Sequence, residues 1–241
     1  MKKNQYKTVF VSDIHLWHPK NQWNKLITFL DSINFENLII VWDFIDYRQL
    51  NRFGRWWKKE KDVLDYINNL SKKWINITYI QWNHDRKFKS SDKIKIDNMT
   101  ICRDLHYKTW KWKSYYITHW DCMDWINKDW GKIWQLWSLM FWLLFKIEFL
   151  RNKNVYKNSY LSIAEKFEEW IKKRRMPDEK INKLIIQFSK NLNCDWIIIW
   201  HFHLIKHYKI HNLDYYCTWD WLTHHAAVVE NLEWELELIT M

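Results

Sequence analysis

The chain has 241 residues, of which 48% are hydrophobic and 27% are charged. These proportions exclude a disordered, fibrous or collagen-like protein, and the length allows a large buried core. The net charge of +10 favours anionic partners such as phosphates, nucleic acid or an acidic membrane surface. Many of the lysines fall on predicted helix faces, where a plain solvated surface is the favoured interpretation, so charge alone does not choose a partner.

Short apolar runs alternate along the chain with longer segments of helical spacing. The runs predict buried strands at Thr8–Ser12, Leu38–Val41, Ile77–Gln81, Tyr115–Thr118 and Ile197–Ile199. Helical spacing of apolar residues predicts helices over Asn21–Ile33 and Trp56–Lys73. Strands that alternate with helices indicate an α/β fold.

Closely spaced strands follow residue 200. They are predicted at His207–Ile210, Tyr215–Thr218, Ala226–Glu230 and Glu233–Ile239. We interpret them as an antiparallel meander that completes a second sheet. Residues 1–241 are therefore expected to form a single domain.

The stretch 123–195 breaks the strand rhythm and is predicted to be a mostly helical insertion within that domain. Its centre, Ile133–Phe145, is intensely apolar. A helix of this length spans about 20 Å, which is shorter than the ~30 Å hydrocarbon core of a bilayer. The segment is therefore interpreted either as a buried core helix or as an apolar lid that holds a lipid chain or dips into a membrane surface.

The first residues, MKKNQYKTVFVSD, contain no apolar signal sequence. Four scattered cysteines form no CxxC pair and are expected to be reduced thiols. We therefore expect a cytoplasmic protein, in peripheral contact with the inner face of the cytoplasmic membrane if 133–145 meets lipid.

Residues of metal-ligand type directly follow five predicted strands. They are Asp13 and His15; Asp43 and Asp46; Asn83, His84 and Asp85; His119 and Asp121; and His201 and His203. Because ligands collect at the carboxyl ends of strands in open α/β sheets, we expect the five groups to converge on one crevice. Carboxylates, imidazoles and an amide oxygen suit a pair of divalent metal ions. Two such ions about 4 Å apart hold a phosphoryl oxygen and lower the pKa of a bound water.

This ordered set of motifs resembles the calcineurin-like metallophosphoesterase family. The resemblance implies a four-layer α/β fold, in which two mixed sheets pack as a sandwich flanked by helices, with two metal ions between the sheet ends. Manganese is the expected metal, with iron, zinc and magnesium as alternatives.

The resemblance also implies a role for each matching residue. Asp13, His15 and His203 would hold one metal ion. Asn83, His119 and His201 would hold the other, and Asp43 would bridge the two. His84 would contact the phosphate as general acid and be oriented by Asp85. Asp46 and Asp121 would lie next to the metal ligands and help to orient them.

Three further segments, SDIHL, DFIDYRQL and YYCTWDWLTHHAAVVE, resemble UDP-2,3-diacylglucosamine diphosphatases and their relatives. The implied reaction is attack of water on the pyrophosphate, which yields UMP and 2,3-diacylglucosamine 1-phosphate. An apolar lid and a positive charge suit this lipid-linked nucleotide sugar, and Arg48 and Lys166 are candidate substrate contacts. His84 departs from the pattern, because the relatives best known for this substrate commonly carry Arg there.

Three alternatives stay open. A phosphodiesterase or nuclease of the same fold would use the positive charge to bind nucleic acid. The second alternative is a catalytically inactive scaffold, and the third is a membrane-surface binding module that uses 133–145.

Glycine is scarce, with 2 residues, whereas tryptophan is abundant, with 21. A chain of this length normally carries about 17 glycines. The family has glycine beside its motifs where this chain has Trp42, Trp82, Trp120 and Trp200. Other tryptophans fit the same rule: Trp17, Trp74, Trp110, Trp112, Trp125, Trp196, Trp219 and Trp234. We hypothesise that UGA codons meaning glycine are written here as tryptophan, whereas Trp221, and either Trp56 or Trp57, are genuine.

Overall fold

The computed structural model describes residues 3–16, 22–41, 44, 58–81, 98–109, 111, 113–119, 147, 178–189, 192, 194, 196–200, 206–210, 213–218, 221 and 225–241. The chain divides into two compact units, one of Met1–His119 with Cys194–Met241 and one of Trp120–Asn193. Both sheets belong to the first unit.

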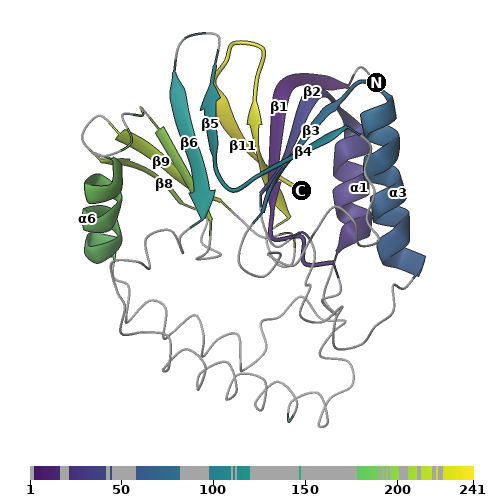
Figure 1. The fold of residues 1–241 in the computed structure, drawn as a ribbon, viewed down its shortest axis with the longest axis horizontal. Coiled ribbons are helices and arrows are strands. Elements are labelled where there is room, and N and C mark those ends of the chain that lie inside the picture. Colours follow the sequence, from purple (N-terminus) through teal and green to yellow (C-terminus); the bar gives the residue numbers. More distant parts are fainter. Residues whose placement is uncertain are drawn as a thin grey trace. The chain divides into compact units, whose positions relative to one another are not determined.

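The first sheet has six strands in the order β11-β10-β1-β2-β3-β4 (Figure 1). The strands are β1 (Asn4–Ser12), β2 (Ile33–Val41), β3 (Asn76–Ile80), β4 (Met99–Cys102), β10 (Ala226–Glu230) and β11 (Leu236–Thr240). Strands β1 to β4 run parallel, and the β10–β11 hairpin pairs antiparallel with β1. The sheet is therefore mixed.

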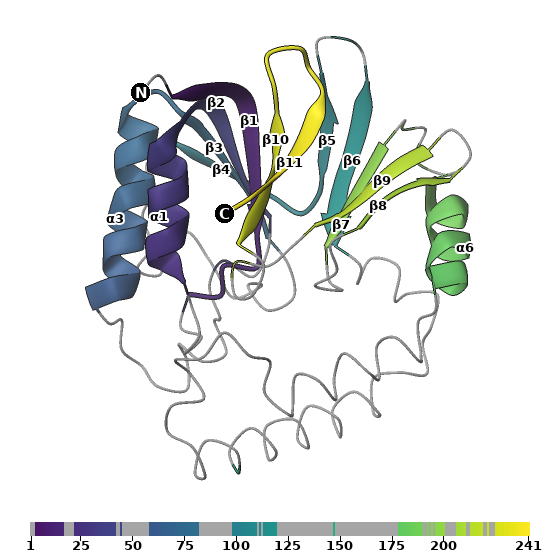
Figure 2. The same ribbon diagram turned by 180° about the vertical axis from the view of Figure 1, so that it is seen from behind.

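The second sheet has five strands in the order β5-β6-β7-β9-β8 (Figure 2). They are β5 (Leu105–Lys108), β6 (Ser114–His119), β7 (Trp196–Trp200), β8 (Lys206–Ile210) and β9 (Leu213–Thr218). Strands β6, β7 and β9 are parallel, while β5 and β8 pair antiparallel at the two edges.

The predicted C-terminal meander is wrong. The β8–β9 hairpin completes the second sheet as expected, but β9 runs parallel to β7 and the β10–β11 hairpin joins the first sheet beside β1. The physical reason is burial on both faces of β10, since all five of its residues are buried. Such a strand fits a central position between two apolar layers.

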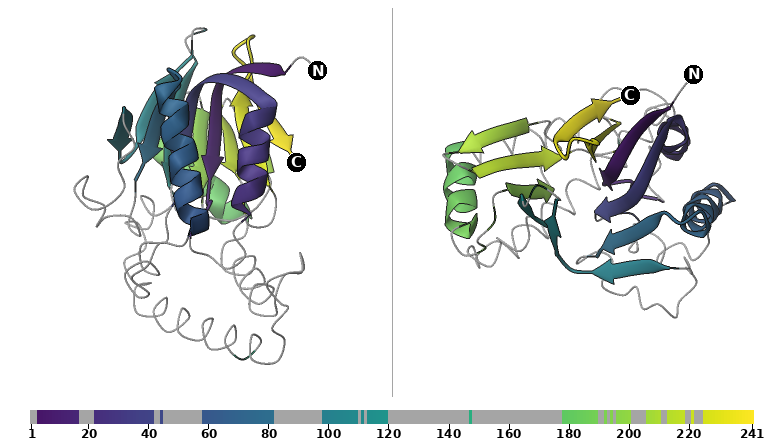
Figure 3. Two further views of the ribbon diagram at one scale, coloured as in Figure 1. Left: turned by 90° about the vertical axis from the view of Figure 1, so that its right-hand side faces the viewer. Right: turned by 90° about the horizontal axis from the view of Figure 1, so that it is seen from above.

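Alternate residues of the first sheet face two separate apolar layers. Val9 and Val11 of β1 pack in a core with helices α1 (Trp23–Ser32) and α3 (Lys58–Lys72), which lie together on one face of the sheet (Figure 3). Phe10, between them, packs on the other face against Tyr115 and Ile117 of the second sheet. This period of two is the property of a strand, and it makes the two sheets pack face to face.

The predicted mixed α/β fold with two packed sheets is confirmed. The helix expected over Asn21–Ile33 ends at Ser32, and Ile33 begins β2. In the second unit, helix α6 (Asp178–Ser189) buries Ile185. The helical insertion over 123–195 stays a prediction, and its apolar centre lies outside the described residues. In the described part of the chain, no helix is both long enough and apolar enough to cross a membrane.

Candidate metal centre

Three parallel strands of the first sheet end at one edge. Ser12, the last residue of β1, is in register with Val41 of β2, which is in register with Ile80 of β3. The chain continues from these ends toward the three predicted ligand groups that begin with Asp13, Asp43 and Asn83. Of these, Asp13 and its neighbour His15 are described.

Asp13 and His15 have left-handed backbone conformations, with φ of 50° and 45°. This region is uncommon outside glycine, although Asp and His tolerate it better than most residues. Backbone strain of this kind persists only where the surrounding structure enforces it, and it clusters at functional sites. The turn directly after β1 therefore contains two strained residues that a simple connecting loop would not require.

The turn brings a carboxylate and an imidazole together. Oδ1 of Asp13 lies 3.7 Å from Nε2 of His15. Asp13 is buried, whereas His15 is partly exposed. Ligand atoms bind a divalent transition metal at about 2.0–2.2 Å, so two atoms at this separation can contact one ion. The donor set and its spacing thus fit a metal site, although in the described ranges no group of three His, Cys, Asp or Glu comes together.

Backbone hydrogen bonds brace this turn from two sides. The N–H of Leu16 donates to the carbonyl of Phe44, 2.8 Å away, and the N–H of Trp221 donates to the carbonyl of Asp13, 3.3 Å away. Both partners are anchored in the core, where Phe44 packs on Tyr79 and Trp221 packs on Phe29. Sequence reasoning did not identify this bracing, and the only signal for it was the apolar character of the two residues.

The second sheet also ends beside predicted ligands. His119 is the last residue of β6 and is in register with Trp200, the last residue of β7. Ile117, two residues before His119, belongs to the same packed cluster as Val41 and Ile80, which end β2 and β3. The other predicted site residues lie outside the described residues: Asp43, Asp46, Arg48, Asn83, His84, Asp85, Asp121, Lys166, His201 and His203.

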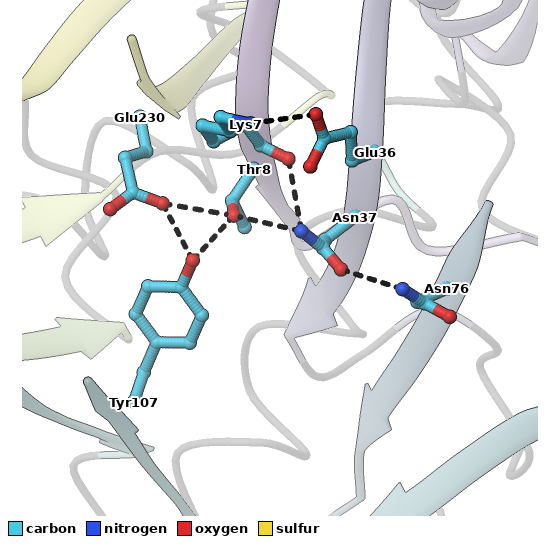
Figure 4. Close-up of polar contacts among 7 residues, drawn as sticks. All are labelled: Lys7, Thr8, Glu36, Asn37, Asn76, Tyr107 and Glu230. Atoms are coloured by element: carbon cyan, nitrogen blue, oxygen red, sulfur yellow. Dashed lines mark hydrogen bonds and ion pairs between the residues drawn. The ribbon is translucent and has the colours of Figure 1, made fainter. Parts of the chain in front are cut away.

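A polar cluster between the sheets was missed by the sequence analysis (Figure 4). Glu230, Thr8 and Asn37 are in register across β10, β1 and β2. Tyr107 of β5 donates to Oε2 of Glu230 at 2.6 Å, and Thr8 Oγ1 donates to the same oxygen at 3.0 Å. Asn76 Nδ2 on β3 extends the row by donating to Asn37 Oδ1 at 3.0 Å. The sequence signal for this cluster was the presence of polar residues within the apolar runs TVFVS and AAVVE.

Burial governs the electrostatics of this cluster. Glu230 is fully buried, and among the described residues its Oε1 has no hydrogen-bond partner. Burial raises the pKa of the Glu230 carboxyl, while the hydrogen bonds from Tyr107 and Thr8 and the charge of Lys7 partly oppose that rise. Burial, together with the hydrogen bond to Glu230, also raises the pKa of Tyr107. The neutral forms are thus favoured where the sheets meet.

No family model and no curated protein matches the chain. Among solved structures, a novel archaeal phosphodiesterase matches 97% of this chain and 99% of its own, with 14% identity and a TM-score of 0.49. Vacuolar protein sorting 29 from Cryptosporidium parvum matches 97% and 95%, with 8% identity and a TM-score of 0.44. A conserved uncharacterized protein from Streptococcus pneumoniae, described as a predicted phosphoesterase, matches 98% and 98%, with 7% identity and a TM-score of 0.39.

Proposed function

We propose that the chain is a metal-dependent hydrolase of phosphoric esters or anhydrides. The observation that carries the proposal is the Asp13–His15 pair, held on strained backbone directly after β1. The ends of β2, β3 and β7 precede further ligand groups, and His119 is the last residue of β6. Ligands gathered at strand ends are the usual arrangement for a site in an α/β sheet.

In the proposed centre, Asp13, His15 and His203 would hold one divalent ion, Asn83, His119 and His201 would hold a second, and Asp43 would contribute to both. Bound ions of this kind polarise a phosphoryl oxygen and supply a nucleophilic water at neutral pH. His84, oriented by Asp85, gives its proton to the leaving oxygen. Asp46 and Asp121 fix the orientation of the ligands.

The finer proposal concerns the substrate. We propose UDP-2,3-diacylglucosamine, cleaved to UMP and 2,3-diacylglucosamine 1-phosphate, with manganese as the metal. The resemblance of three segments to diphosphatases of this type supports it, as do the charge of +10 and the apolar stretch Ile133–Phe145. Arg48 and Lys166 contact the diphosphate in this proposal, and the apolar stretch provides contact with acyl chains or the membrane surface.

Hydrolysis of bis-p-nitrophenyl phosphate with added Mn²⁺ tests the general activity. The protein used carries Trp42→Gly, Trp82→Gly, Trp120→Gly and Trp200→Gly, since an indole beside each motif would crowd the metal ions. We expect this protein to hydrolyse the substrate. Adding Asp13→Ala should lower the rate by more than the ~10–100-fold that is typical when a residue outside the ligand set is changed. Bound manganese without turnover, or turnover that Asp13→Ala leaves intact, would contradict the proposal.

The substrate is tested separately on the same glycine-bearing protein. Detergent-dependent cleavage of the acylated nucleotide sugar supports the finer proposal. Cleavage of RNA or DNA with steep salt dependence favours the nuclease alternative instead. Liposome binding without any turnover would favour a membrane-surface module.

A further inference from the structure

Two tryptophans of the described chain have backbone conformations that belong to glycine. Positive φ occurs at six non-glycine residues in the described ranges: Asp13, His15, Trp74, Asn98, His225 and Trp234. Asp, Asn and His tolerate the left-handed region, but a bulky residue there is a true outlier. Trp74 has a φ of 66° and Trp234 a φ of 67°.

Trp74 ends helix α3 in a Schellman motif. The N–H of Ile75 donates to the carbonyl of Leu70 at 3.4 Å, and the N–H of Trp74 donates to the carbonyl of Ser71 at 3.3 Å. This pair of bonds defines the motif and places Trp74 at its left-handed position, which glycine usually occupies because it has no Cβ. The Trp74 side chain is 93% exposed, so burial of the indole does not offset the strain.

Trp234 occupies the equivalent position in a hairpin. Between β10 and β11, the N–H of Trp234 donates to the carbonyl of Asn231 at 3.1 Å, and the N–H of Asn231 donates to the carbonyl of Glu235 at 3.0 Å. This is a three-residue loop in which a tight turn is followed by one left-handed residue, a site that glycine usually fills. Asn231 Oδ1 accepts from the N–H of Glu233 and the N–H of Glu235, so side-chain hydrogen bonds also hold the loop. The partly buried indole of Trp234 lies 5.3 Å from Lys7 Nζ, a contact that both the alanine and the glycine variants remove.

Trp221 provides the contrast within the same chain. Its side chain is 1% exposed, packs on Phe29 in the core, and is not among the residues with positive φ. The structure therefore separates a tryptophan that the core needs from two that sit at turns built for glycine.

We infer that the functional protein carries glycine at positions 74 and 234 and tryptophan at position 221. The inference concerns the chemical identity of the chain and does not depend on the proposed activity. It rests on backbone geometry, which is independent of the motif comparison that first suggested misread UGA codons. It also predicts that codons 74 and 234 are UGA and that codon 221 is UGG.

Equilibrium urea unfolding of matched variants tests the geometry. Alanine removes the indole but keeps Cβ, whereas glycine removes both, so only a left-handed site distinguishes them. We expect Trp74→Gly to have an unfolding constant about fivefold lower than Trp74→Ala, and the same ordering for Trp234→Gly and Trp234→Ala. Trp221→Gly is the control and should be strongly destabilised, because it opens a cavity in the core. Alanine variants as stable as the glycine variants at both positions would overturn the inference.

Peptide mass spectrometry of the protein isolated from its natural source tests the identity directly. Glycine at 74 and 234 with tryptophan at 221 is the expected result, whereas tryptophan at 74 or 234 would overturn the inference. Neither measurement depends on catalysis, so both results can be interpreted even if the proposed hydrolase activity is not found.

Discussion

Two polar groups lie on and beside strand β1, one past its carboxyl end and one at its middle. Each contains a buried carboxyl group, Asp13 in the first and Glu230 in the second. Asp13 sits on left-handed backbone, and its Oδ1 lies 3.7 Å from Nε2 of His15, which is longer than a hydrogen bond. Glu230 sits in a regular strand and accepts two hydrogen bonds, of 2.6 and 3.0 Å.

The difference teaches what each group is for. Glu230, Thr8 and Tyr107 hydrogen-bond to one another through Oε2 of Glu230 and join two sheets, so their removal should affect stability. Asp13 and His15 are held in left-handed conformations of the kind that clusters at functional sites, so their removal should affect chemistry. A residue that contributes to activity at the expense of stability can be recognised because its removal lowers the activity without lowering the free energy of unfolding.

The largest expected effect is at Asp13. Asp13→Gly, made in the glycine-bearing protein used for the assay, removes both the carboxylate and the backbone strain. We expect activity on bis-p-nitrophenyl phosphate to fall by more than about 100-fold, while the free energy of unfolding stays level or rises by about 1 kcal/mol. Paired kinetic and urea measurements check it. A variant that loses stability and keeps its activity would reverse the assignment of roles.

Glu230→Ala should produce the opposite result. It leaves the hydroxyls of buried Thr8 and partly buried Tyr107 without their common acceptor and opens space between the sheets, so we expect a loss of about 2–4 kcal/mol in unfolding free energy. Urea unfolding monitored by tryptophan fluorescence measures it. A loss below about 0.5 kcal/mol would show that the cluster does not hold the sheets together.

The pH dependence of stability sharpens the comparison further. Because the pKa of Glu230 is raised above its ordinary value of 4.5, the folded state binds a proton that the unfolded state releases once the pH exceeds that value. The contribution of Glu230 is therefore complete below pH 4.5 and declines as the pH rises through the folded-state pKa. Glu230→Gln stays neutral, so its stability relative to the parent should improve as the pH rises from 4.5 through the folded-state pKa. A constant difference across this interval would contradict the shift.

The smallest effect is expected at the edge of the same cluster, where Lys7 Nζ lies 2.8 Å from Glu36 Oε1 and the Glu36 side chain is 62% exposed. Glu36→Gln keeps the size of the side chain and removes the charge. We expect a change of at most about 0.5 kcal/mol in unfolding free energy, since exposed ion pairs are screened by water and salt. Compared with Glu230→Gln, this variant isolates the effect of burial. A loss as large as that of Glu230→Ala would show that the surface pair matters more than its exposure suggests.

Much of the fold follows from local pattern, because β1, β2, β6 and β7 contain the predicted apolar runs and β3 contains all but the last residue of its run. Strands β4 and β5 were not predicted, since Met99–Cys102 and Leu105–Lys108 are short and only partly buried, without an apolar run. The sheet to which β10 belongs was predicted wrongly, because pairing with β1 depends on a partner far away in sequence and not on spacing.

The same distinction applies to the site residues. Asp13 and His15 could be picked out because they directly follow a strand whose end is visible in the sequence. The Thr8–Tyr107–Glu230 cluster could not be predicted, because its members are separated by 99 and 222 residues and meet only through tertiary structure. Trp74 and Trp234 show a third case, in which an unexpected residue type revealed a backbone requirement.

The position of β10 beside β1 constrains how the protein is made on the ribosome. One edge of β1 is covered early by β2, but the other edge pairs with Val228, Val229 and Glu230. Until that distant segment has emerged, β1 presents an uncovered row of backbone donors and acceptors, which invites pairing with other chains. Such long-range pairing also slows folding. The pairing of β1 is therefore completed only after Glu230 has been synthesised, and until then that edge of the strand stays open to other chains.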